Sequence, residues 1–173
     1  LDLPLVTLVG IVLADVGLHL PDPFAGERVF QVLTQVAGRA GRSERSGKVV
    51  LQTFDPTNQV IQSAARHDVS EFYQYELGQR KRLGYPPFSR LVRLEYRHHD
   101  AAKAEEEAHR TAKKLSALQH ARTTMIGPVP CFFAKVGGYY RWQIVLRGSD
   151  PKELLRDIKL DGWRIEVEPV SLL

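Results

Sequence analysis

Apolar residues follow one another almost without interruption near the start of the chain, from Leu3 to Ala14. A run rich in Val and Ile is typical of a strand that is buried on both faces, as in a parallel sheet. Asp22-Pro23 then predicts the start of a helix, whose apolar residues recur at helical spacing until Gly38 or Gly41. Lys48–Phe54 is a second Val-rich run. A strand, a helix and a strand in this order predict one right-handed crossover unit of a larger parallel sheet.

Helical spacing continues in the middle of the chain. Apolar residues predict a short helix over Val60–Ala65 and a second helix that begins after Asp68. Asp68 and Glu71 have the spacing of a capping box, in which side chains satisfy the first backbone N–H groups of a helix. Gly84 and the prolines that follow it end this helix. The predicted organisation is a first domain over residues 1–56, a helical linker over 57–88 and a second domain over 89–173.

The second domain alternates in polarity, which is the pattern of strands with one buried and one solvated face. Leu91–Arg97 is the first such strand, and Gly137-Gly138 separates two more in a hairpin. Helices are expected after Asp100 and after Ser149, and a last strand begins at Trp163. This order predicts a ferredoxin-like (split βαβ) α+β domain, so the chain as a whole belongs to the α/β class. Residues expected on the buried side include Leu115, Leu118, Trp163, Ile165 and Val167.

Composition excludes several classes of protein. The chain has 173 residues, 43% apolar and 25% charged, as expected of a globular protein, and no apolar run is long enough to span a membrane. Cys131 is the only cysteine, so no internal disulfide and no cysteine-rich zinc site can form within the chain. The histidines show no metal-ligand spacing, and we expect no metal site. Because the chain begins with Leu1 and not with Met, we expect a piece of a longer protein.

The net charge of +4 is concentrated in one segment. Between Gly78 and Arg97 the only acidic residue is Glu95. A basic cluster favours a polyanion such as DNA, although basic residues at the end of a helix also complement its dipole. The candidate DNA-binding or partner-binding residues of this segment are Arg80, Lys81, Arg82 and Arg90.

The segment Gln35–Arg42 carries the strongest functional signal. Arg39 and Arg42 stand among glycines, directly after the predicted helix. Glycine lets the backbone turn tightly and approach a ligand, and a guanidinium matches phosphate oxygens with its rigid fork of donors. Such a pair can neutralise the charge that builds up during phosphoryl transfer. A solvated Gly/Arg loop is the simpler interpretation of any single Gly-Arg pair.

The full spacing Gln-x-x-Gly-Arg-x-Gly-Arg resembles motif VI of superfamily 2 helicases, in which the glutamine and both arginines face ATP between two lobes. The likeness extends along the chain, which resembles the primosomal protein N′ (PriA) family of replication-restart helicases. Within that family the first part of the chain resembles the end of the RecA-like second helicase lobe, and the rest resembles the C-terminal region. The segments that carry the resemblance are Ala14–Asp22, Glu27-Arg28, Gln35–Arg42, Arg82–Phe88, Gly127–Pro130 and Gly137–Gln143.

The resemblance implies a DNA-binding, ATP-binding hydrolase of the bacterial cytoplasm, associated with the nucleoid and not with a membrane. The longer protein would unwind DNA from 3′ to 5′ with ATP and Mg²⁺ and take part in primosome assembly. Its partners would be forked and single-stranded DNA, single-stranded-DNA-binding protein and other primosome proteins, and it would hold structural zinc. This chain has neither the phosphate-cradling Gly-Lys-Thr loop, nor the Asp-Glu magnesium site, nor the zinc cysteines. Alone it is therefore expected not to hydrolyse ATP.

The resemblance also implies roles for individual residues. Arg42 would be the arginine finger, Arg39 would contact the γ-phosphate, and Gln35 would help to set their geometry. Asp2, at the end of motif V, and Asp15 would couple ATP to DNA. Asp15 could equally cap a neighbouring helix.

The strand Tyr139–Arg147 has two faces with different chemistry. Tyr140 and Trp142 share one face with Ile144 and Leu146, which predicts core packing. Tyr139, Arg141 and Gln143 share the other face. An aromatic ring and a guanidinium fork suit single-stranded DNA or the terminal carboxylate of an acidic partner tail, but an ordinary polar sheet face has the same composition.

Two functions of different class fit the sequence. In one, the chain is part of an ATP-driven DNA motor and supplies its motif VI arginines. In the other, residues 57–173 form a stand-alone binding module for nucleic acid or protein, without catalysis. A truncated fragment with no function of its own is a third possibility.

Overall fold

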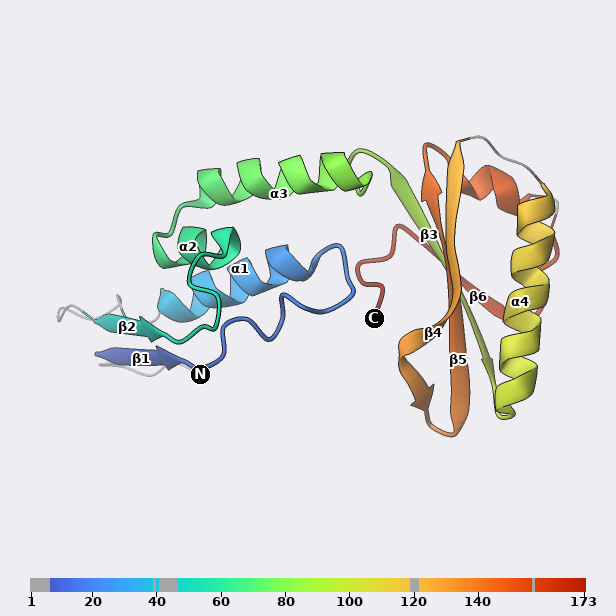
Figure 1. Ribbon diagram of the computed structural model, residues 1–173, viewed down its shortest axis with the longest axis horizontal. Coiled ribbons are helices and arrows are strands. Elements are labelled where there is room, and N and C mark those ends of the chain that lie inside the picture. The colour runs from blue at the N-terminus through green and yellow to red at the C-terminus, as the bar shows by residue number, and fades with distance from the viewer. Residues whose placement is uncertain (1–6, 39, 41–46, 119–121, 157) are drawn as a thin grey trace. The chain divides into compact units, whose positions relative to one another are not determined.

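A two-stranded parallel sheet and a four-stranded antiparallel sheet form the framework of the chain (Figure 1). The computed structural model describes residues 7–38, 40, 47–118, 122–156 and 158–173. The chain divides into two units, Leu1–Gln79 and Arg80–Leu173, each with one of the sheets. This is the mixed α/β class that the sequence predicts. The helical segment 57–88, predicted as a linker, is divided between the two units.

In the first unit, β1 (Leu8–Ile11) pairs in parallel with β2 (Lys48–Leu51), and α1 (Ala25–Ala37) connects them. The predicted order of strand, helix and parallel strand is confirmed. The helix begins later than predicted, at Ala25. The carboxylate of Asp22 accepts a 2.8 Å hydrogen bond from the backbone N–H of Phe24, so a turn precedes the helix.

Apolar side chains of this small sheet are exposed. Leu8 on β1 is 62% exposed and Val50 on β2 is 59% exposed. The strand is therefore not buried on both faces in the part of the sheet that the structure describes. Two strands and one connecting helix leave apolar side chains uncovered that additional strands and helices of a larger sheet would bury.

Helices α2 (Gln59–Ala65) and α3 (Val69–Leu83) follow, and α2 and the first part of α3 complete the core of the first unit. The rings of Phe30 on α1 and Phe72 on α3 stack, with centroids 3.9 Å apart and planes inclined by 6°. Stacked rings of this size bury a large apolar area between two helices. The other buried members of this core are Ala14, Val29, Leu33, Val60, Ile61 and Ala64.

Helix α3 agrees with the sequence at its start and differs in its apolar stripe. Asp68 accepts a 2.8 Å hydrogen bond from the N–H of Glu71, as the capping-box spacing predicts. Phe72 is 1% exposed, but three other apolar residues that helical spacing predicts on the same stripe face solvent, because Phe72 is the only residue of α3 in the described core. These exposed residues are Val69, Tyr73 and Leu77.

The second unit has the predicted order of elements. Its strands lie in the order β4-β5-β3-β6, and all neighbours are antiparallel. The first strand of the unit therefore lies beside the last, as in ferredoxin-like domains, and the predicted fold is confirmed. The elements are β3 (Arg90–His98), α4 (Ala101–Ala117), β4 (Thr123–Val136), β5 (Tyr139–Gly148), the 3-10 turn η1 (Pro151–Leu155) and β6 (Trp163–Val167).

Helix α4 covers one face of this sheet (Figure 1). Val92 and Leu94 from β3 and Ile144 and Leu146 from β5 are fully buried against Ala108 of the helix. The opposite face carries no helix of this unit among the described residues. We refer to it as the helix-free face; its central side chains come from alternate residues of β3 and β5.

The second predicted helix of this unit is much shorter than expected. It is a single 3-10 turn over Pro151–Leu155, although Ile158 still packs against the core. Ile165 and Val167 on β6 are consequently 46% and 40% exposed, whereas Trp163 is buried. The prediction that the whole apolar side of the last strand is buried is wrong because a short turn cannot cover it. Leu118, at the C-cap of α4, is also exposed.

Candidate functional site

The Gly/Arg segment follows the last turn of α1. Gln35 lies on this turn with its side chain exposed, and Gly38 is the C-cap that ends the helix where the sequence predicts. Arg39, Arg42 and Asp2, the other predicted nucleotide contacts, lie outside the described residues. The structure therefore gives the helix that precedes the motif but not the positions of its arginines.

One residue of this segment, Ala40, is in contact with the start of β2. Ala40 is 2% exposed and lies against Gly47, which directly precedes β2. A Cβ atom at Gly47 would come within 1.9 Å of the carbonyl oxygen of Ala40, so only glycine permits this approach. The contact holds Ala40 beside the residue that directly precedes β2.

Asp15, at the carboxyl end of β1, is 6% exposed. Its carboxylate accepts hydrogen bonds from the hydroxyl of Thr53 at 2.5 Å and from the N–H of Phe54 at 2.9 Å. These hydrogen bonds hold the pKa of Asp15 below its usual value. Within the described residues Asp15 therefore joins the ends of the two parallel strands and does not cap a helix.

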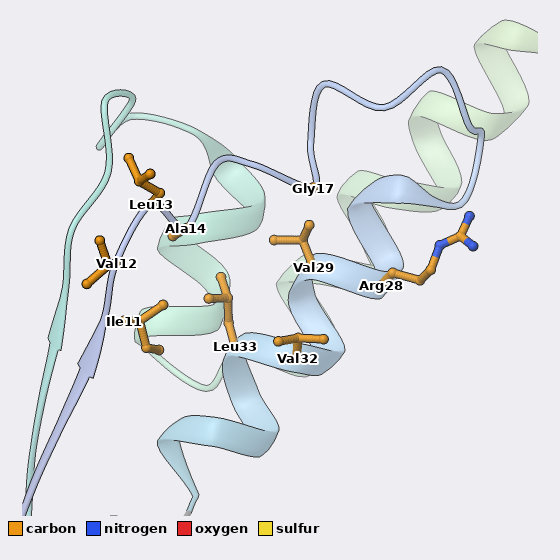
Figure 2. Close-up of a pocket in the computed structure, with 9 residues that line it drawn as sticks. All are labelled: Ile11, Val12, Leu13, Ala14, Gly17, Arg28, Val29, Val32 and Leu33. Atoms are coloured by element: carbon orange, nitrogen blue, oxygen red, sulfur yellow. The ribbon is translucent and has the colours of Figure 1, made fainter. Parts of the chain in front are cut away.

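An apolar cavity of about 310 Å³ lies between the end of β1 and helix α1 (Figure 2). Arg28 is the one charged residue of its lining, and the guanidinium points away from the apolar side chains toward Asp22, with which it forms a 2.5 Å ion pair. No acid, base or nucleophile lines the cavity, so it has the chemistry of a packing surface. The apolar lining is Ile11, Val12, Leu13, Ala14, Gly17, Val29, Val32 and Leu33.

The predicted basic residues gather at one end of the second sheet. Arg80, Lys81 and Arg82 are in the last turn of α3, and Arg90 begins β3. Arg147 of β5 joins this region to the sheet, because it donates a 2.7 Å hydrogen bond to the carbonyl oxygen of Leu83. The same guanidinium lies 5.1 Å from the ring centre of Tyr85. These contacts hold the last turn of α3, which belongs to the second unit, against the sheet of that unit.

Arg141 is at the centre of the helix-free face. Its Nε and Nη2 donate hydrogen bonds of 2.8 and 2.9 Å to the two carboxylate oxygens of Glu95 on β3. Its Nη1 donates to the carbonyl oxygen of Phe133 at 3.3 Å. The guanidinium beside Glu95 holds the pKa of that carboxyl below its usual value. The fork that the sequence offers to a ligand carboxylate therefore already holds a carboxylate of the chain.

Arg93 extends this network and is 5% exposed. Its Nη2 lies 3.2 Å from Glu95, and its Nε donates a 2.9 Å hydrogen bond to the side-chain oxygen of Gln143. Cys131 of β4 lies beside Arg93, with its sulfur 3.8 Å from Nη2, and burial raises the pKa of this thiol. The prediction that Arg93 faces solvent is wrong because β4 bulges over it. Gln143 is likewise engaged within the chain.

Tyr139 begins β5 after the Gly137-Gly138 turn, whose positive φ angles of 57° and 82° suit glycine. Its ring lies 3.7 Å from that of His99 and 5.1 Å from the guanidinium of Arg97. Tyr139 is thus packed between basic groups at the hairpin end of the sheet. Tyr139, Arg141 and Gln143 share one face, as the alternation predicts.

The structure does not bring the two predicted binding sets together. In the pairing of β3 with β5, Arg90 lies opposite Gly148 and His98 lies opposite Tyr140. The eight residue steps between these pairs correspond to about 26 Å at about 3.3 Å per residue. The basic end and the hairpin end are therefore separate regions of one sheet.

Residues 81–170 match a family model described as the primosomal protein N C-terminal domain. This match covers more than half of the chain and nearly all of the second unit. The chain belongs to this family. Arg82, Arg90, Arg141 and the other predicted binding residues of the second unit lie within the matched range, except Arg80.

Three curated relatives of this primosomal family are each called replication restart protein PriA. The chain is 39% identical over 170 residues to that of Bacillus subtilis, 42% over 183 residues to that of Treponema pallidum and 38% over 180 residues to that of Synechocystis. The alignments cover 97–99% of this chain but only 21–28% of the relatives. The likeness therefore includes the first unit as well as the family domain.

Sequence reasoning missed the inner members of the network in this primosomal domain: Arg93, Glu95 and Cys131. Arg93, Glu95 and Arg97 are alternate residues of one strand, so the sequence does predict that they share a face of the sheet. What the pattern lacks is the pairing of β3 with β5, which sets Glu95 opposite Gln143. Cys131 carries no such signal, because it lies in the irregular part of β4.

Other chemistry is limited in the described part of the chain. No three His, Cys, Asp or Glu side chains among those residues are grouped closely enough to hold a metal ion. Likewise, no described helix combines the length and apolarity that a membrane span requires. The groups available for binding there are guanidinium, ammonium, carboxylate and aromatic side chains.

Proposed function

We propose that this chain is part of a longer ATP-dependent DNA helicase of superfamily 2 that acts in replication restart and primosome assembly. The observation that supports this most is its similarity to replication restart proteins along 97–99% of its length, which includes the Gly/Arg segment. A likeness confined to residues 81–170 would have supported a binding role alone. The enzyme would use ATP and Mg²⁺, with the magnesium ligands and any structural zinc outside this chain.

In this proposal the Gly/Arg segment forms one wall of a nucleotide cleft. The guanidinium of Arg42 neutralises the charge that develops on the transferred phosphoryl group, and Arg39 binds the γ-phosphate. Gln35, exposed on the last helical turn, contributes to the same wall, and Asp2 lies in the neighbouring motif. ATP supplies the phosphoanhydride bond whose hydrolysis drives translocation. The exposed helix end and Gly38 leave the backbone accessible to such a ligand.

The uncovered apolar surface of the first unit supports a place in a larger parallel sheet. Leu8, Val12 and Val50 are each more than half exposed, and Val12 also lines the apolar cavity. Contiguous apolar surface of this kind marks an interface in most folded proteins. We propose that the remaining strands and helices of a RecA-like lobe cover it.

The second unit is proposed to bind DNA and a partner protein. The basic end, with Arg80, Lys81, Arg82 and Arg90, suits the phosphate backbone of forked or single-stranded DNA. The face with Tyr139, Arg141 and Gln143 suits the acidic tail of single-stranded-DNA-binding protein, whose terminal carboxylate would exchange with Glu95 in the Arg141 fork. Other primosome proteins would be further partners, and the protein would act in the bacterial cytoplasm at the nucleoid.

The test is strand separation by the full-length protein. On a forked DNA whose duplex can be entered along only one strand, we expect ATP-dependent unwinding in the 3′ to 5′ direction. The isolated chain should give no DNA-stimulated ATP hydrolysis, because it supplies only one wall of the cleft. Unwinding without ATP, or turnover by the purified chain, would contradict the proposal.

A second candidate is a stand-alone binding module formed by residues 57–173. The observation that favours it is that the family domain at 81–170 lies almost wholly within the second unit. In that case the full-length protein would bind single strands or acidic peptides with the same affinity whether or not it carries Arg39→Ala and Arg42→Ala, and no ATP-dependent step would be found.

A further inference from the structure

Two phenylalanines project from a bulge in the edge strand β4. Pro130 pairs with Trp142 and Lys135 pairs with Tyr140, so residues 131–134 of β4 face residue 141 alone. The excess chain carries Phe132 and Phe133, which are 48% and 56% exposed. Their rings meet edge to face, with centroids 5.0 Å apart and planes at 84°. Exposed aromatic rings side by side are uncommon on a solvated surface and indicate a binding role.

The bulge is held in place from beneath. Cys131 is 2% exposed, and its sulfur accepts from Arg93 Nη2 at 3.8 Å. On the other side, Nη1 of Arg141 donates to the carbonyl oxygen of Phe133 at 3.3 Å. Both contacts come from the helix-free face, and Figure 1 shows the lower part of β4 curling away from α4. Because the backbone is fixed, little conformational entropy is lost when a ligand meets the rings.

One cationic group adjoins the two rings, and a second projects from the same face of the sheet. Arg141 lies directly beside Phe133. Arg97 pairs opposite Arg141 and therefore projects from the same face, where its guanidinium lies 5.1 Å from the ring centre of Tyr139. Glu95, the acidic group of this network, is already neutralised by two arginines. The combination of open rings and nearby cations is that of surfaces which stack bases and follow a phosphate backbone.

We propose that Phe132 and Phe133 form a stacking site for unpaired bases of single-stranded nucleic acid, with Arg97 contacting the phosphates. This inference rests on the proposed DNA-binding role of the second unit and gives it a location and a mode. A duplex does not fit, because its bases are stacked on one another and their faces are not available to a protein ring.

The centre of the sheet explains why the rings stand on the bulge. Ferredoxin-like domains that bind RNA stack bases on aromatic residues of their central strands. Here the corresponding surface holds the ion-paired side chains of Arg93, Glu95 and Arg141. The rings of the bulge supply the flat apolar surface that the centre lacks.

The experiment compares the unchanged chain with a double variant that carries both Phe132→Leu and Phe133→Leu. Leucine keeps the apolar character and approximate size but removes the ring. The probes are oligothymidine of about 15 nucleotides, within the site sizes of single-strand binders, and an abasic oligonucleotide of the same length. Val129→Ala with Val136→Ala is the matched control, because both valines are exposed on the same strand without a ring. Thermal melts verify that all variants remain folded.

We expect the double leucine variant to bind oligothymidine about tenfold more weakly, which is about 1.4 kcal/mol, or roughly one lost base stack. Its affinity for the abasic strand and the behaviour of the valine control should match the unchanged chain. Oligothymidine binding that survives the leucine changes would overturn the stacking site alone, and equal loss on both probes would overturn base stacking as well, because the abasic strand offers no bases. No binding of either probe by the unchanged chain would overturn the DNA-binding role as well.

Discussion

The carboxylate of Glu95 on β3 accepts hydrogen bonds from both Nε and Nη2 of Arg141 on the neighbouring strand β5, at 2.8 and 2.9 Å. Paired donors that point the same way are what a guanidinium uses to bind a carboxylate or phosphate. A ligand carboxylate that seeks the same fork must therefore displace Glu95. The position of Glu95 makes it an internal competitor of any anionic partner on the helix-free face.

Glu95→Gln should strengthen binding of an acidic peptide that ends in a carboxylate. Glutamine keeps the size of the side chain but loses the charge and one acceptor, so the fork of Arg141 is partly freed. We expect an affinity gain of about tenfold, since hydrogen bonds to charged groups are worth about 1.5–3 kcal/mol. Titration of the peptide followed by calorimetry measures this.

Glu166→Gln is the matched control for that change. Glu166 lies 4.0 Å from Arg93 rather than in the Arg141 fork, and its loss changes the net charge by the same amount. If both variants gain affinity equally, the effect is one of general charge and Glu95 is not a competitor. If neither gains, the peptide does not use this fork.

The stability of the second unit should depend on pH through Glu95. Arg141 holds the pKa of Glu95 below its ordinary value of 4.5, so the ionised pair stabilises the folded state at neutral pH. This contribution is present above pH 4.5 and is lost as the pH falls through the lowered pKa. The melting temperatures of the unchanged chain and of Glu95→Gln should therefore differ at pH 7 and converge as the pH falls through the lowered pKa of Glu95. A difference that is constant with pH would contradict the ion pair.

Ile144→Ala and Ile165→Ala should lower the free energy of unfolding by very different amounts, although both isoleucines lie on the same face of the sheet. Ile144 is fully buried under α4, and its truncation should cost about 2–5 kcal/mol of unfolding free energy. Ile165 is 46% exposed because η1 is short, so its truncation should cost less than about 1 kcal/mol. Chemical denaturation of the two variants measures both values. Equal losses would mean that another part of the protein covers β6.

These examples show what the sequence can predict of this fold. Gly137-Gly138 marked the hairpin, and the order of strands and helices marked the ferredoxin-like domain, because both depend on local patterns of spacing and turn chemistry. The exposure of Leu8 and Ile165 could not be predicted in this way. Burial depends on which other elements cover a strand, and a pattern of apolar residues gives only the side that could be buried.

The candidate sites follow the same distinction. Alternation assigns Tyr139, Arg141 and Gln143 to one face from the sequence alone. The ion pair of Arg141 with Glu95 joins residues 46 positions apart. No local sequence pattern encodes such a contact. The likeness to helicase motif VI gives roles to Arg39 and Arg42, which lie outside the described residues.

The basic end of the second sheet should determine the salt dependence of DNA binding. Replacing Arg80, Lys81 and Arg82 with Ala should weaken binding to all sequences alike, because phosphate contacts release counterions. If all three contact phosphates of a single strand, their loss should make the negative slope of log K against log salt shallower by about 2. Lys113→Ala with Lys114→Ala, at exposed positions of α4, is the control for the loss of positive charge. An unchanged slope with reduced helix content would show that these residues only complement the end of α3.

The helicase proposal is tested most directly by Arg42→Ala in the full-length protein. An arginine finger acts mainly in the transition state, so its loss should lower kcat for DNA-stimulated ATP hydrolysis by about 10³-fold or more. Nucleotide affinity, measured with a non-hydrolysable ATP analogue, should change much less. The account predicts slow turnover with nearly normal nucleotide binding, and near-normal turnover by Arg42→Ala would contradict it.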